Sequence, residues 1–367
     1  MKRLTFILLI LSGISGLSCG SDVDPAGKVF LLPSGARSLG MGGCGTLLGE
    51  SYGGLYNPAA QALTSDLSGA VYLNPSPYFI SGFDFLTLAA GAHTEFGYIG
   101  FSYLSRDGVE GSNLPPEEAS SLVLAGRPVK ERNFAVGVAM KILASRKANF
   151  VSLNQSLSKS YKMAFDLGAV YAGILPQITF GKSEPEENDP RAKYGRPFPR
   201  GIAVGLAFQN LGGRINYDYA IDVEMLPQLF RADLLWGIYE GRLWDLRVAG
   251  QLNKLLVARN AAGGYKSATD AFTSAWGGGG NEGGWTSRMG LELSVLSLAS
   301  ARLGWSVLYG EHCSYTHAGL GLGPEWLRAN LAWEHQPGSD YRLSRELRYD
   351  LTVNVSYERV RGWTKQY

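Results

Sequence analysis

Residues Asp350–Glu358 read DLTVNVSYE and alternate strictly between apolar and polar side chains. One face of this stretch carries Leu351, Val353, Val355 and Tyr357, and the other carries Asp350, Thr352, Asn354, Ser356 and Glu358. Successive side chains of a β-strand point to opposite faces, so the stretch predicts a strand with one apolar and one polar face. Such a strand suits a membrane barrel, in which lipid covers one face and the lumen covers the other, but a strand of a soluble β-sandwich could show the same pattern. The repetition of the pattern along the chain is therefore the stronger signal.

Segments with similar alternation recur along the chain and predict 14 strands. They lie at residues 67–79, 84–93, 96–106, 120–127, 134–143, 162–172, 201–210, 229–239, 244–254, 286–296, 300–308, 315–322, 327–334 and 349–358. A tilted strand crosses a bilayer with about 9 to 11 residues, and bacterial barrels have an even number of strands. We therefore predict an all-β fold, a 14-stranded antiparallel transmembrane β-barrel over residues 65–358.

The connections between these segments alternate in length. Long connections lie at residues 107–119, 144–161, 211–228, 255–285 and 335–348, and short ones lie near residues 94 and 132 and at 240–242, 297–299 and 323–326. Membrane barrels have short periplasmic turns and long outer loops, so this alternation favours a membrane barrel over a soluble β-sandwich. The connection at 173–200 breaks the rule, because it is long and should be periplasmic. Its charged run EPEENDPR, Glu184–Arg191, indicates either a solvated insertion or a periplasmic docking loop.

The composition excludes several other classes of protein. A mean hydropathy of −0.04 excludes a bundle of membrane helices, which needs repeated apolar runs of about 20 residues. A net charge of +2 provides no basic footprint for nucleic acid. The chain has 48 glycines, about twice the usual share of roughly 7%, which suits a barrel better than a soluble α/β enzyme.

The first 20 residues predict a secretory signal peptide. Lys2 and Arg3 precede the apolar core Leu4–Leu17, which is too short for a membrane-spanning helix. Cys19 lacks a leucine three residues before it, so we expect ordinary cleavage near residues 18–20 rather than lipidation. An exported barrel belongs in the cell outer membrane, as an integral protein in contact with outer-membrane lipid. The remaining chain divides into a hatch segment at 21–64, the barrel, and a tail at 359–367.

The stretch Gly35–Ala60, GARSLGMGGCGTLLGESYGGLYNPAA, follows neither the signal pattern nor the strand pattern. We expect it to fold inside the lumen as a hatch, because glycine lets a backbone pass close to the inner wall. Arg37 would then need an inward-facing acid, and the choices are Asp166, Glu292 and Glu334. Asn57-Pro58 is expected to fix the turn into the first strand. The candidate hatch residues are Gly35, Arg37, Gly40, Met41, Gly42, Gly43, Asn57 and Pro58.

The inward faces of the predicted strands differ in character. Two of them, near residues 135–139 and 201–207, present mostly glycine and alanine and would leave space in the lumen. Others carry charged side chains inward, namely Lys141, Asp166, Arg231, Asp233, Arg247, Glu292, Arg302, Arg328 and Glu334. These charges indicate either a solvated lumen with cross-strand ion pairs or a clamp on the hatch or on a ligand headgroup.

No catalytic, cofactor or metal site stands out in the sequence. Gly40–Gly45 matches GxGxxG, but a dinucleotide site needs that motif inside a βαβ unit, which the chain lacks. His312, His317 and His335 would reach one metal ion only if separate loops converged, so ordinary loop polarity is favoured. Cys44 and Cys313 could pair, but two cysteines do not make a disulfide scaffold. We predict a protein that is not an enzyme and that has no cofactor.

The segments GARSLGMGG and YNPAA resemble the opening of the PorV/PorQ family, within the larger group of FadL-like long-chain fatty-acid transporters. Further similar segments are AFDLGAVY at 164–171, GIAVGLAFQNLGGRINY at 201–217, LPQLFRADLLWG at 226–237 and AGLGLG at 318–323. The resemblance implies a 14-stranded outer-membrane barrel with its N-terminal segment inside. The chain departs from the family pattern at the 173–200 insertion and at the tail beyond the last strand.

The resemblance implies two functions. PorV-like proteins act in type IX secretion, where they receive cargo and hand it to a surface sortase, and this is the function we expect first. Its partners would be envelope proteins, namely secretion or sortase components and cargo. The alternative is a FadL-like passive transporter, which passes hydrophobic small molecules through a lateral opening and has a hydrophobic ligand as its partner.

Overall fold

A computed structural model describes residues 26–64, 67–74, 85–106, 116–128, 134–148, 157–172, 201–215, 224–240, 243–261, 263–277, 282–308, 313–324, 326–335 and 345–355. The expected signal peptide, the 173–200 connection and the tail at 359–367 lie outside the described residues. Within the described part, no helix is both long enough and apolar enough to cross a membrane.

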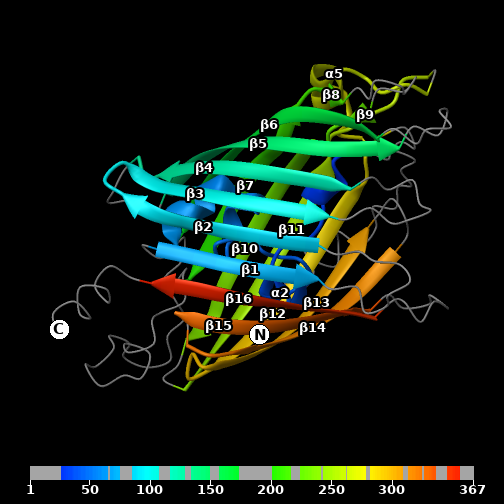
Figure 1. The fold of residues 1–367 in the computed structure, drawn as a ribbon. Coiled ribbons are helices and arrows are strands. Elements are labelled where there is room, and N and C mark those ends of the chain that lie inside the picture. Colours follow the sequence, from blue (N-terminus) through cyan, green and yellow to red (C-terminus); the bar gives the residue numbers. More distant parts are fainter. Residues whose placement is uncertain are drawn as a thin grey trace.

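Fourteen antiparallel strands close into a barrel (Figure 1). In chain order they are β1 (Leu67–Asn74), β2 (Phe85–Thr94), β3 (Gly97–Arg106), β4 (Glu117–Gly126), β5 (Phe134–Ala148), β6 (Leu157–Ala172), β7 (Ile202–Gly212), β10 (Leu229–Glu240), β11 (Trp244–Leu255), β12 (Trp285–Val295), β13 (Ala299–Leu308), β14 (Cys313–Leu322), β15 (Leu327–His335) and β16 (Arg345–Val355). Each strand pairs with its neighbours in this order, and β1 closes the barrel by pairing with β16. The predicted fold class and strand number are confirmed.

The two ends of the barrel differ. We call the end where β1 finishes the long-loop end, and the end where β1 begins the short-turn end. A tight turn at Thr94–Gly97 lies at the short-turn end. A small hairpin of β8 (Arg214–Ile215) and β9 (Glu224–Met225) and the helix α5 (Ala268–Ser274) lie at the long-loop end (Figure 1).

The apolar faces of the strands point outward and the polar faces point into the lumen. On β16, Leu351 is 47% exposed and Val353 is 38% exposed, whereas Asp350 and Thr352 are buried. The same holds on β12, where Leu291 and Leu293 are exposed and Glu292 is buried. This is the arrangement of a barrel whose outer face contacts lipid.

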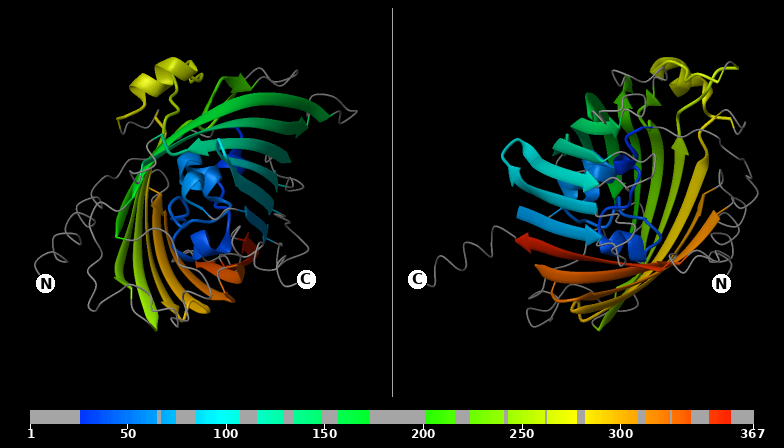
Figure 2. Two further views of the ribbon diagram at one scale, coloured as in Figure 1. Left: turned by 90° about the vertical axis from the view of Figure 1, so that its left-hand side faces the viewer. Right: turned by 45° about the vertical axis from the view of Figure 1, so that its right-hand side comes forward.

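The N-terminal segment fills the lumen (Figure 2). It contains the 3-10 helix η2 (Lys28–Phe30), the short helices α2 (Ala36–Gly40) and α3 (Gly53–Tyr56), and the 3-10 helix η3 (Pro58–Leu63). It begins at the long-loop end, where the Ala26 N–H donates to the carbonyl of Met225 at 3.0 Å. It ends at the short-turn end, where η3 leads into β1. We call residues 26–63 the hatch, and its described side chains are buried or half-buried.

Candidate functional site: the hatch and the lumen wall

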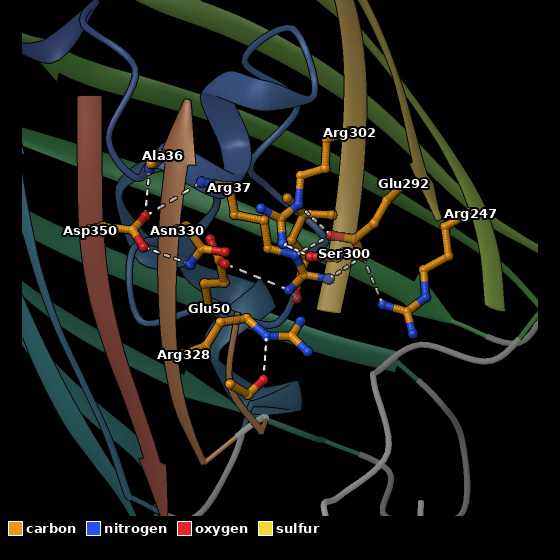
Figure 3. A network of polar contacts seen from close by, with 12 residues as sticks. Ala36, Arg37, Glu50, Arg247, Glu292, Ser300, Arg302, Arg328, Asn330 and Asp350 are labelled. Carbon is orange, nitrogen blue, oxygen red and sulfur yellow. Dashed lines mark hydrogen bonds and ion pairs between the residues drawn. The ribbon is translucent and has the colours of Figure 1, made fainter. Parts of the chain in front are cut away.

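A buried ion pair joins the hatch to the wall of the lumen (Figure 3). Arg37 of α2 donates from Nε and Nη2 to the two carboxylate oxygens of Glu292 on β12, at 2.8 and 2.6 Å. Two guanidinium groups of the wall bind the same carboxylate, Arg302 at 2.7 Å and Arg247 at 3.2 Å. Of the three acids that the sequence offered Arg37, the structure selects Glu292.

A second carboxylate from the hatch lies beside this cluster. Glu50 Oε1 lies 3.6 Å from Arg37 Nη1, and the same nitrogen donates to the Leu48 carbonyl at 3.0 Å. Burial raises the pKa of Glu50 from 4.5 to about 7, against the lowering effect of Arg37. The arginine is therefore held by the hatch and by the wall together, which fixes α2 at one height in the lumen.

The N-terminus of α2 is bound by a wall carboxylate. Asp350 of β16 accepts from the backbone N–H groups of Ala36 and Arg37, and Asn330 of β15 donates to its other oxygen at 2.6 Å. The first N–H groups of a helix have no partner within the helix, and a negative charge there is favourable. A helix of only five residues is thus stabilised by the barrel rather than by its own sequence.

Asn57 anchors the other part of the hatch. Its Oδ1 accepts from the Ala59 N–H at 3.0 Å and so caps η3, with Pro58 in the first turn. Its Nδ2 donates to the carbonyls of Ala169 on β6 and Leu206 on β7, at 3.2 and 3.1 Å. One side chain therefore both starts the 3-10 helix and joins it to two adjacent strands.

Glycines of the wall leave room for the hatch at three places. Gly290 and Gly304 are cross-strand partners, and β-carbons there would lie 2.5 Å from Met41 and 2.0 Å from the Gly42 nitrogen. Gly137 and Gly168 are also partners, and β-carbons there would meet Ala59 N at 2.5 Å and Asn57 Oδ1 at 2.0 Å. Real contacts are never so close, so these wall positions require glycine. The third contact is between Gly40 and Gly319, whose backbones approach each other closely.

The glycines of the hatch have conformational reasons of their own. Gly35, Gly42 and Gly43 have φ angles of 93°, 73° and 86°, in a region that disfavours other residues. The Gly43 carbonyl also accepts from Arg288 Nη1 of β12 at 3.3 Å. The Cys44 thiol that follows is buried and free, so the disulfide with Cys313 is not formed.

An irregularity between β6 and β7 forms a further contact. The ladder shifts register between Phe165 and Leu167, and Asn210 of β7 has a φ of 56°. The carboxylate of Asp166 accepts from the Asn210 N–H at 2.7 Å and pairs with Lys141 at 2.6 Å. Gln209, next to Asn210, donates to the Leu55 carbonyl of the hatch at 2.6 Å.

The other predicted lumen charges have separate roles. Arg231 lies over the Tyr56 ring of the hatch at 4.9 Å, and Asp233 accepts from Gln251, which also donates to Thr46 of the hatch. Arg328 instead donates to carbonyls at the short-turn end, Ser297 at 2.8 Å and Gly323 at 3.3 Å. Glu334 lies 3.4 Å from His317, whose Nε2 is 3.0 Å from Ser306 Oγ. The charges thus divide between hatch contacts and wall-to-wall contacts.

Sequence reasoning missed the anchor of η2. Glu117 of β4 accepts from the N–H groups of Gly27 and Val29, both at 2.9 Å, and pairs with Arg106 of β3 at 3.0 Å. Glu117 fell in the predicted connection 107–119, whereas β4 begins at this residue, so the alternation of the predicted strand at 120–127 did not include it. A search for acids facing a glycine-rich segment would have found it.

The lumen near the long-loop end is lined by apolar side chains. Its wall side chains include Tyr72, Phe85, Leu104, Leu143 and Leu226, which are buried in one hydrophobic cluster. Val29, Phe30 and Leu32 of the hatch pack into this cluster. The centroid of the Phe30 ring lies 5.0 Å from the Lys141 ammonium, where this apolar cluster meets the charged side chains of the wall.

A small cavity separates the hatch from β2, β3 and β4. It encloses about 10 Å³, on the order of one water molecule. Its lining includes Leu55 and Gly54 of the hatch and Tyr98, Phe101 and Val123 of the wall. The hatch and the wall are thus less closely packed on this side than at the glycine contacts.

No protein-family model matches the sequence, and no curated protein sequence matches it significantly. Solved structures do match the fold. One is CymD, described as a monoaromatic hydrocarbon channel, with 11% identity and a TM-score of 0.53 over 88% of this chain and 98% of that one. Another is the toluene transporter TbuX of Ralstonia pickettii, with 10% identity and a TM-score of 0.50 over 87% of this chain and 97% of that one. At these identities the likeness concerns the fold.

Proposed function

We propose that the protein is a passive outer-membrane transporter of hydrophobic small molecules, with its long-loop end facing the outside of the cell. The observation that carries the proposal is the apolar cluster that lines that end of the lumen and that the hatch now fills. Burying apolar surface is favourable by about 25 cal/mol per Å², so this lining would accept apolar compounds in preference to polar solutes once the hatch shifts. The fold that the chain has in common with CymD and TbuX supports the same class of function.

Transport requires the hatch to shift. The hatch occupies the lumen from one end to the other, and the cavity beside β3 has room for about one water molecule. A hydrocarbon therefore cannot pass while every anchor is in place. The cavity beside β2–β4 marks the natural route, because the Arg37 ion pair and the glycine contacts hold the hatch to the other walls. The Glu117 anchor on β4 holds η2, which does not line this cavity.

The secretion role that the PorV/PorQ resemblance implied is not part of this proposal. Two of the solved structures that match the fold, CymD and TbuX, are described as a monoaromatic hydrocarbon channel and a toluene transporter, which favours the alternative that the sequence offered. A function in type IX secretion, with its protein partners, stays a prediction from the sequence.

Uptake measurements test the proposed function. The full chain is expressed in a Gram-negative host without its own hydrocarbon transporter, and the cells are given radiolabelled toluene or oleate. We expect faster uptake of at least one compound than in cells with an empty vector, and unchanged entry of a polar sugar. Equal rates for both hydrophobic compounds and the vector control would reject the proposal.

A reversible lock tests whether the hatch moves. A β-carbon on Gly54 would lie 3.2 Å from Val123 Cγ2, so cysteines at these two positions are close enough for a disulfide. In the variant Gly54→Cys/Val123→Cys, oxidation should stop uptake and reduction should restore it. The two single variants are the controls. If the oxidised double variant transports as fast as the reduced one, the route does not require movement of the hatch away from β4.

A further inference from the structure

The segment between β11 and β12 folds back over the outside of the barrel (Figure 2). Two rings of this segment cover two rings of the wall. Phe272 of α5 lies 5.2 Å from Phe208 on β7, and Trp276 lies 5.2 Å from Phe230 on β10, measured between ring centroids. Phe208 and Phe230 are themselves cross-strand partners. We call the described residues 256–261, 263–277 and 282–284 the outer flap.

The wall rings under the flap belong to the outward face of the barrel. The residues on either side of Phe208, Ala207 and Gln209, are buried on the lumen face of β7. Leu206, which shares the face of Phe208, is 54% exposed. Phe230 lies on the same outward face as Leu234, which is 40% exposed. The flap therefore rests on the lipid-facing surface near the long-loop end rather than over the mouth of the lumen.

A buried lysine fixes the flap in this position. Lys254 of β11 donates to the carbonyls of Gly277 and Gly283, both at 2.6 Å, and lies 5.3 Å from the centroid of the Trp285 ring. Lys254 is fully buried although its cross-strand partner Trp285 is on the outward face. A buried ammonium with three such contacts makes the flap a fixed part of the fold.

The helix of the flap has two different sides. Thr269, Asp270, Thr273 and Ser274 are exposed, whereas Ala271 and Ala275 are buried. Trp276, directly after the helix, is covered on one side by Phe230 and remains 38% exposed. Its indole N–H donates to the Phe272 carbonyl at 2.8 Å, so the exposed part of the ring is apolar.

We infer that the outer flap is a membrane anchor that rests at the headgroup–acyl boundary of the outer leaflet. Phe272 and Trp276 would contact the beginning of the lipid chains, and the polar side of α5 would face the headgroups and water. Aromatic residues are enriched at this depth, and short helices with a polar side lie in the plane of the interface.

Lipid fits this surface better than a protein partner does. The exposed apolar part of the flap continues the lipid-facing surface of the barrel. It consists mainly of one tryptophan ring, whereas a stable protein interface buries about 800 Å² on each partner. The anchor is independent of the compound that the barrel transports.

Fluorescence quenching by brominated lipids tests the anchor. The full chain is placed in phosphatidylcholine nanodiscs whose lipids carry bromine either near the headgroup or near the chain end. The contribution of Trp276 to the tryptophan fluorescence is obtained as the difference in emission between the wild type and Trp276→Phe. We expect this contribution to be lost with headgroup-proximal bromine and retained with chain-end bromine. Trp244, which is 41% exposed at the opposite rim, provides the interfacial reference through Trp244→Phe.

Two results would overturn the inference. A Trp276 contribution that neither lipid quenches, but that aqueous iodide quenches, would place the ring in water. A contribution shielded from both lipid and iodide would indicate contact between copies of the protein. The double variant Phe272→Ser/Trp276→Ser supplies a second measurement. A polarity-sensitive dye is attached to Thr273→Cys, and its emission spectrum should show that the dye moves into water when the two rings are removed. An unchanged dye spectrum would also count against the anchor.

Discussion

Arg37 of the hatch and Glu292 of β12 form a two-bond ion pair, with both side chains almost completely buried. The same carboxylate is bound by two arginines of the wall. Removing the carboxylate would leave three positively charged guanidinium groups close together without the negative charge that they share. This arrangement makes Glu292 the residue on which the position of the hatch depends most.

Replacing Glu292 with Gln should destabilise the folded barrel by about 3–5 kcal/mol, the usual cost of breaking a buried ion pair from one side. The free energy of unfolding would be measured by urea titration in detergent micelles. Arg37→Gln alone should cost less, because Arg302 and Arg247 still bind the acid. The double variant should show strong coupling between Arg37 and Glu292, and additive costs would contradict the pairing.

Replacing Gly168 with Ala should loosen the hatch, because the added β-carbon would lie 2.0 Å from Asn57 Oδ1. Overpacking of this kind costs about 1–3 kcal/mol. Hydrogen exchange of the η3 amides should become faster. The matched control is Gly69→Ala, where a β-carbon would meet only the Ala89 carbonyl oxygen at 3.8 Å. Asn57→Ala should remove most of the penalty of Gly168→Ala, and no such rescue would show that the two residues do not compete for space.

Stability should fall as the pH rises through the range in which Glu50 ionises. Its pKa is raised from 4.5 to about 7 in the folded protein, so the folded state binds more protons than the unfolded state between these values. At about 1.4 kcal/mol per pKa unit, the loss is on the order of 3 kcal/mol and is complete above about pH 7. Glu50→Gln should remove this part of the pH dependence. If the wild type and the variant show the same pH profile, Glu50 is already ionised in the folded state.

The Cys44 thiol should report when the hatch leaves its place. Burial raises its pKa to about 12, so the thiol is protonated as well as shielded at neutral pH. In a Cys313→Ser background, a maleimide reagent should react with the folded protein at least tenfold more slowly than with the urea-unfolded protein. Adding a transported compound should speed the reaction. A fast reaction without ligand would mean that the hatch is already displaced.

The fold was predictable from the sequence because alternation repeats in every strand. The pairing of Arg37 was predictable only in part. A charged hatch side chain inside a barrel needs an acid, but the choice of Glu292 over Asp166 or Glu334 depends on the height at which α2 crosses the lumen. That height is set by contacts such as Ala36 with Asp350, which alternation does not reveal.

The role of Asn57 was harder to foresee. The sequence indicated a turn, and the side chain does cap η3. Its bonds to β6 and β7 depend on Gly168, which is one of 48 glycines and carries no local signal of its own. The apolar cluster at the long-loop end escaped prediction for a similar reason, since its side chains come from many strands and meet only when the barrel closes.

The path of the hatch constrains the order of assembly. The segment that precedes the first strand runs the full length of the lumen, while the first and last strands form the final seam. A finished cylinder would offer only its two ends for threading this peptide and its buried charges. Assembly of the wall around the peptide avoids this threading, and it requires the machinery that inserts the protein to keep the seam apart until the last strand arrives. A hatch that fails to dock would leave the cylinder open.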